Sequence, residues 1–106
     1  MTRPDAQVMA DRWIEAWAGD DAEAVLVQLH GEATIADPDA GKIRPMSIAA
    51  FVARELADPG RRKVTSWRAH AGADSVAIVQ RFEDGSEGVD VLVVADGKVV
   101  RAMRHG

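Results

Sequence analysis

The chain has 106 residues, enough for one domain with one hydrophobic core, and its 47% hydrophobic and 28% charged residues are typical of a globular protein. The formal net charge of −4 gives no general attraction to nucleic acid or to anionic lipid. Cysteine is absent, which excludes disulfides and a cysteine zinc site, and neither an export signal nor a membrane-spanning run is predicted, so we expect a cytoplasmic protein.

Two helices are predicted at the start of the chain. Residues 5–18 have apolar side chains at three- and four-residue steps with charged residues between them, which indicates an amphipathic helix. Asp20, followed three residues later by Glu23, forms an approximate capping box for a second helix over residues 21–29. We expect His30 and the glycine after it to end that helix.

A short strand, an irregular connection and a third helix are expected next. Residues 33–36 read as the strand, and two prolines and a glycine in "DPDAGKIRPM" favour an irregular segment. Ser47 is then predicted to cap a helix over residues 48–57.

Four further segments read as strands, over residues 62–70, 74–83, 87–95 and 98–105. The "DG" between the last two is a strong signal for a two-residue hairpin. A meander of four antiparallel strands is the simplest arrangement. With the helices gathered at the start of the chain, the sequence predicts an α+β fold with helices packed on one face of a curved sheet.

The third of these strands, "GVDVLVVA", is apolar on both faces. Asp90, Leu92 and Val94 would share one face, and Val89, Val91 and Val93 the other. Because three short helices cover only one face of a sheet, we expect a second subunit to cover the other, giving a homodimer.

The order of elements resembles the cone-shaped, cystatin-like α+β barrel of the nuclear transport factor two superfamily, which includes SnoaL-like polyketide cyclases, limonene epoxide hydrolases and ketosteroid isomerases. The stretch "GDDAEAVLVQLHGEATIADPDAG" is similar to the second helix and "ATVEDP" strand of the ketosteroid isomerases, and "GVDVLVVADGKVVRAM" is similar to their "ID" strand, hairpin and last strand. This resemblance covers almost the whole chain, and it implies three N-terminal helices on a curved, mainly antiparallel sheet.

The resemblance implies that Asp37 is a proton-shuttling base and that Asp90 donates a hydrogen bond in an oxyanion hole, both opening on an apolar pocket. Asp90 also lies among apolar strand residues, where lost hydration should raise the pKa of its carboxyl and let the protonated form donate. Each has a structural interpretation as well. Asp37, before Pro38, is typical of an Asx turn, and a carboxylate near a strand end such as Asp90 often binds a loop backbone group.

Two features depart from the relatives named above. The catalytic tyrosine of the isomerases lies on the first helix, whereas this chain has no tyrosine and Trp13 stands at the matching position. An indole N–H donates one hydrogen bond but is a much weaker acid than a phenol. The epoxide hydrolases use an arginine and two aspartates. Here Arg81 and Glu83 match the first pair, but Arg104 stands where the second acid is expected, so that triad is incomplete.

Several other residues are predicted to line the pocket, and each has an alternative role in the core or at an element end. They are Trp13, Trp17, His30, Phe51, Val52, Phe82, Leu92 and Met103. Since the histidines show no metal-ligand spacing, we expect no metal, and no cofactor is implied. The basic run at residues 61–63 is interpreted as the solvated start of a strand.

Two functions remain open for this sequence. One is a cofactor-independent isomerase or cyclase acting on a small hydrophobic ligand, in which Asp37 removes a proton next to a carbonyl group while Asp90 and Trp13 donate to the enolate oxygen. The other is a non-catalytic module of the same fold that binds a small molecule or forms a dimeric assembly.

Overall fold

A computed structural model describes residues 1–105, and within them the chain forms three helices and six strands. The elements are α1 (Arg3–Ala18), α2 (Ala22–Leu26), β1 (Leu29–Asp37), β2 (Gly41–Ile43), α3 (Pro45–Ala57), β3 (Val64–Ala71), β4 (Ser75–Phe82), β5 (Glu87–Ala95) and β6 (Lys98–His105). The strands form one sheet in the order β2-β1-β6-β5-β4-β3, in which only β1 and β6 are parallel neighbours. The predicted α+β class and the four-stranded meander are confirmed.

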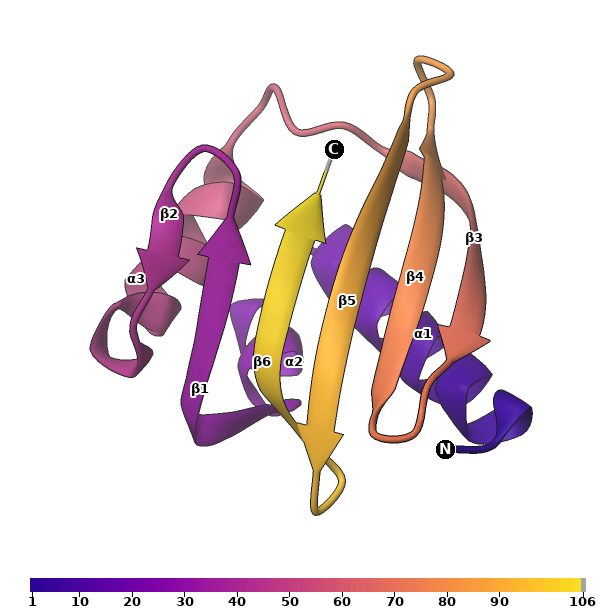
Figure 1. Ribbon diagram of the computed structural model, residues 1–106. Coiled ribbons are helices and arrows are strands. Elements are labelled where there is room, and N and C mark those ends of the chain that lie inside the picture. The colour runs from indigo at the N-terminus through magenta and orange to yellow at the C-terminus, as the bar shows by residue number, and fades with distance from the viewer. Residues whose placement is uncertain (106) are drawn as a thin grey trace.

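All three helices lie on one face of the sheet, which curves around them (Figure 1). Helix α1 packs across β3 and β4, α3 packs on β1 and β2, and α2 contacts both of the other helices. Because β2 and β3 remain at opposite edges, the sheet curves without closing into a barrel. The space between α1, α3 and the inner face of the sheet therefore stays accessible from one end.

The core lies between the helices and the inner face of the sheet. Its largest fully buried side chains include Trp13 from α1, Ile35 from β1, Ile78 from β4 and Leu92 from β5. The strands supply them largely by alternation: in β4, for example, Val76, Ile78 and Gln80 are buried and the residues between them are half-buried. The core thus fixes which side chain of each strand faces the helices.

The first part of the chain departs from the predicted boundaries. Helix α2 ends at Leu26, and His30 lies in β1 instead of ending the helix. The cause is Leu29, which is buried and pairs with Val99 of β6, so the chain is already extended there. A helix of five residues is stabilised mainly by its neighbours, and its sequence pattern does not specify where it ends.

The segment after β1 is more regular than predicted. Gly41–Ile43 forms β2 and pairs with Ile35, Ala36 and Asp37 as a hairpin, where an irregular connection was expected. Helix α3 then begins at Pro45, so Ser47 lies inside it and Arg44 takes the N-cap position. A proline is favourable in the first helical turn because the missing N–H has no partner there.

No helix in the described part of the chain combines the length and the apolar character that crossing a membrane requires.

Candidate functional site

A cavity of about 630 Å³ opens between α1, the inner face of the sheet and the loop at residues 58–63. This volume falls in the ordinary range for small-molecule sites. Asp37 and Asp90, the two carboxylates singled out in the sequence, both line it, and Trp17 and Phe82 form parts of its wall. The lining also includes further charged or polar residues, namely Asp39, Glu55, Asp58, Arg61, Arg62, Lys63, Gln80, Arg104 and His105. The cavity is therefore much more polar than the apolar pocket that the resemblance implies.

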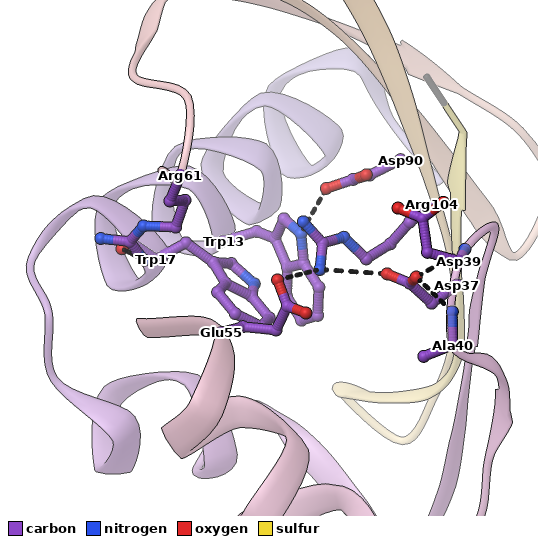
Figure 2. A network of polar contacts seen from close by, with 9 residues as sticks. All are labelled: Trp13, Trp17, Asp37, Asp39, Ala40, Glu55, Arg61, Asp90 and Arg104. Atoms are coloured by element: carbon purple, nitrogen blue, oxygen red, sulfur yellow. Dashed lines mark hydrogen bonds and ion pairs between the residues drawn. The ribbon is translucent and has the colours of Figure 1, made fainter. Parts of the chain in front are cut away.

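Asp90 is held in place by Trp13. The indole Nε1–H donates to Oδ2 of Asp90 at 3.0 Å, and both residues are buried (Figure 2). Burial raises the pKa of Asp90, and this effect exceeds the opposing influence of the Arg104 charge and of the hydrogen bonds from Trp13 and Gln80. The protonated carboxyl therefore persists to higher pH than in an exposed aspartate. This is the direction expected for a carboxylate on an apolar strand.

Trp13 itself does not line the cavity, in contrast to its predicted contact with the ligand. Its side chain is 0% exposed, and its single N–H is already donated to Asp90. An indole has no second donor. Trp13 therefore orients the Asp90 carboxyl and leaves no hydrogen bond for an enolate oxygen.

Asp37 lies at the end of β1 with both carboxylate oxygens engaged. Oδ1 accepts the backbone N–H groups of Asp39 and Ala40 at 2.9 and 3.0 Å, which is the Asx turn that the following proline suggested. Oδ2 lies 3.4 Å from Nη1 of Arg104. The side chain is only 9% exposed and borders the cavity. Asp37 thus combines the two interpretations of the sequence, a turn and a pocket carboxylate.

Arg104 connects the acidic groups of the cavity. Its Nη1 lies 3.4 Å from Asp37 and 3.7 Å from Oε2 of Glu55, and its Cζ lies 5.1 Å from the centroid of the Trp17 ring. Figure 2 shows the guanidinium between the two carboxylates. Strand pairing also sets Arg104 directly beside Asp90. One positive charge is therefore shared among three acidic side chains.

This arrangement differs from the arginine and acid pair singled out in the sequence. Arg81 is exposed and forms an ion pair with Glu87 at 3.1 Å, and neither Arg81 nor Glu83 lines the cavity. A carboxylate–guanidinium–carboxylate group does form, but from Asp37, Arg104 and Glu55.

The remaining predicted pocket residues lie outside the cavity. Phe51, Val52 and Leu92 belong to the core, with exposed fractions of 2%, 0% and 1%. His30 is exposed on β1, where its Nδ1 accepts the backbone N–H of Glu32. Met103 alternates with the buried Ala102 and faces the side of the sheet away from the helices. Their side chains do not border the cavity that Asp37 and Asp90 share.

Three residues of the site did not stand out in the sequence as pocket residues. Gln80 follows Val76 and Ile78 on the buried face of β4, so alternation alone was a usable signal for it. Arg104 carried a comparable signal, since it follows Ala102 by two residues. Glu55 carried none, because a glutamate on a helix is most often solvated.

Comparison with known proteins gives no match among family models and none among curated proteins. Among solved structures, a SnoaL-like protein of unknown function from Burkholderia thailandensis is 27% identical, with a TM-score of 0.85 over 98% of this chain and 95% of that one. The chain has the SnoaL-like fold. A proposed polyketide cyclase from Xanthomonas campestris gives a TM-score of 0.82 at 17% identity over 98% of this chain and 91% of that one.

A third structural neighbour comes from Catenulispora acidiphila. This hypothetical protein with a ketosteroid isomerase-like fold, in complex with trimethylamine, gives a TM-score of 0.72 at 18% identity over 99% of this chain and 87% of that one. These similarities confirm the predicted cystatin-like α+β architecture.

Within the described residues, no group of three or more histidine, aspartate or glutamate side chains is arranged to hold a metal ion. The side chains that line the cavity include carboxyl, guanidinium, ammonium, amide, imidazole and aromatic groups.

Proposed function

We propose that this SnoaL-like cavity binds a small carbonyl compound and moves a proton next to its carbonyl group. The observation that carries the proposal is that Asp37 and Asp90, two carboxyl groups in different environments, line one cavity. Asp37 removes the proton, and neutral Asp90 donates to the oxygen on which enolate charge develops. Two carboxyl groups held in different environments are a recurrent arrangement for acid and base roles.

The contacts of Asp90 suit the donor role. Trp13 donates to Oδ2, and the proposal places the proton of the neutral carboxyl on Oδ1. Gln80, which lines the same cavity, also hydrogen-bonds this carboxyl. Arg104, next to Asp90 in the strand register, adds a positive charge near the developing enolate. An isomerisation or cyclisation of this kind requires no cofactor.

A second candidate, binding without chemistry, is favoured by the contacts of Asp37. Both of its oxygens have partners before any ligand arrives, two backbone N–H groups and the Arg104 guanidinium. A base must direct a lone pair at the proton that it removes. If the Asp37 contacts persist in the complex, the cavity binds its ligand and leaves it unchanged.

The oxyanion role of Asp90 is tested with pentafluorophenol, a phenol acidic enough to be ionised at neutral pH and a mimic of an enolate. We expect it to quench the fluorescence of Trp17 saturably. Below the raised pKa of Asp90 the neutral carboxyl donates to the phenolate. Above that pKa the ionised carboxylate repels it, so affinity should fall as the pH rises through the pKa of folded Asp90.

Asp90→Asn is the matched control for this titration. The amide keeps an oxygen to accept from Trp13 and an N–H₂ group to donate, and it does not ionise. The affinity of the Asp90→Asn variant for pentafluorophenol should therefore lack the decrease with rising pH that ionisation of Asp90 causes. Absence of saturable quenching by the unaltered protein at every pH of the titration would contradict an oxyanion-binding cavity.

We also propose that the chain forms a homodimer through the outer face of the sheet. The helices lie on the other face (Figure 1), and a set of apolar side chains remains half-buried on the outer one: Val79, Val89, Val91, Val93 and Met103. Light scattering should give about twice the mass of one chain at micromolar concentration. Val91→Lys, which places a charge at the centre of this face, should shift the mass to that of a monomer, and a monomeric unaltered protein would contradict the proposal.

A further inference from the structure

Two cationic side chains on the rim of the cavity have no acidic partner. Arg61 and Lys63 both line the cavity, where the basic run had been interpreted as a solvated strand start. Within residues 1–105, the ion pairs join Arg81 to Glu87 and Arg104 to Asp37 and Glu55, and none involves Arg61 or Lys63. Neither cation has a carboxylate within ion-pair distance in this part of the chain. The rim therefore attracts anions locally, although the chain as a whole has a formal charge of −4.

The segment that carries these cations is fixed by hydrogen bonds. Nη1 of Arg61 donates to the backbone carbonyl of Trp17 at 2.8 Å, as Figure 2 shows, and the carbonyl of Lys63 accepts the N–H of Glu83 at 2.8 Å. The nearby Asp58 accepts the N–H of Gly60 through Oδ1 at 2.9 Å. These contacts involve one of the two terminal nitrogens of the Arg61 guanidinium and none of the N–H groups of the Lys63 ammonium. Both side chains therefore keep donors for a ligand.

The charges deeper in the cavity are compatible with an anionic ligand. Arg104 lies close to both Asp37 and Glu55, which offsets part of their negative charge. Burial favours the neutral form of Asp90, which removes a further repulsion. An anion beside Arg61 and Lys63 thus meets two cations that no ion pair within residues 1–105 neutralises, although Asp39 and Asp58 also line the cavity and reduce this attraction.

We infer that Arg61 and Lys63 bind a carboxylate of the ligand whose carbonyl group lies at Asp90. The inference rests on the proposed function and adds the substrate class, a small carbonyl compound that carries a carboxylate. Arg61 offers the planar fork of donors that matches a carboxylate, and Lys63 offers a mobile point charge. Trp17 and Phe82 contact the apolar part between the two ends of the ligand.

The test compares two phenols that differ by one carboxylate, 4-hydroxybenzoate and 4-methylphenol, by quenching of Trp17 fluorescence at neutral pH and low salt. We expect 4-hydroxybenzoate to bind about tenfold more tightly or better, since hydrogen bonds to charged groups are among the stronger ones. Lys63→Gln should remove most of this advantage and leave 4-methylphenol binding unchanged. The advantage should also shrink as salt is added.

Lys42→Gln is the matched control, because Lys42 is an exposed lysine on β2 that does not line the cavity. Arg61→Gln adds a second variant, and its melting temperature shows whether loss of the Trp17 contact disturbs the fold. Equal binding of both phenols by the unaltered protein would overturn the carboxylate site and leave the proposed function standing. If 4-hydroxybenzoate still binds more tightly than 4-methylphenol in the Lys63 and Arg61 variants, the carboxylate site is overturned too. Failure of both phenols to bind would overturn the proposed function itself.

Discussion

Asp37→Asn should slow proton abstraction by about 10²–10⁴-fold, the usual contribution of a positioned general base. An amide does not accept a proton at neutral pH, whereas its oxygen can still accept the N–H groups of Asp39 and Ala40 that close the turn after β1. The ion pair with Arg104 is lost, but the guanidinium keeps Glu55 at 3.7 Å and is not left without a carboxylate. The variant should therefore fold normally and fail in chemistry.

The rate is measured without knowledge of the natural substrate, by NMR, as exchange of the α-protons of 2-tetralone in D₂O catalysed by the protein. Asp74→Asn, which removes an exposed carboxylate from the turn before β4, is the control and should leave the rate unchanged. If Asp37→Asn exchanges the α-protons as fast as the unaltered protein, Asp37 is not the base. The second candidate, binding without chemistry, then takes precedence.

The fold was predictable from the sequence because long, regular patterns determine most of it. The alternation in β4 and β5 and the "DG" turn before β6 placed the meander within a few residues of its observed position. The errors lie where local signals are short. Leu29 belongs to a strand because Val99 pairs with it from the far end of the chain, and no pattern around Leu29 records that contact.

The candidate site was predictable only in part. The environment of Asp90 follows from its own strand, so the rise in its pKa was expected. The Asp37–Arg104–Glu55 group depends on bringing β1 and α3 together with β6 at the other end of the chain. The same holds for Arg61, whose position on the cavity rim depends on its contact with the backbone of Trp17. Sequence patterns indicate which face a side chain takes but not which neighbours it meets there.

Trp13 shows why a residue that matches a catalytic position by resemblance does not take on the role of the residue found there in the isomerases. The resemblance placed it where the isomerases have a catalytic tyrosine, and it does reach the predicted oxyanion donor, Asp90. A phenol has a hydroxyl group that both donates and accepts, whereas an indole donates once. In this chain that one hydrogen bond stabilises a buried carboxyl, so the position contributes to the site through Asp90 alone.

Trp13→Ala should therefore strongly destabilise the fold, with a loss of about 3–5 kcal/mol in the free energy of unfolding. The side chain is fully buried, so its removal leaves a cavity in the core and takes away a hydrogen bond to a buried carboxyl. Since small domains are stable by only about 5–15 kcal/mol, much of the total would be lost. Urea unfolding followed by circular dichroism measures it without relying on tryptophan fluorescence.

Trp13→Phe separates the two contributions, because it keeps most of the buried ring and removes only the N–H. We expect it to cost about 1–3 kcal/mol, the penalty for leaving a buried acceptor without its partner. In an Asp90→Leu background that cost should shrink, since no carboxyl remains to be satisfied, and the double-mutant cycle gives the coupling between Trp13 and Asp90 directly. A cost that stays the same in both backgrounds would mean that Trp13 acts through packing alone and does not orient Asp90.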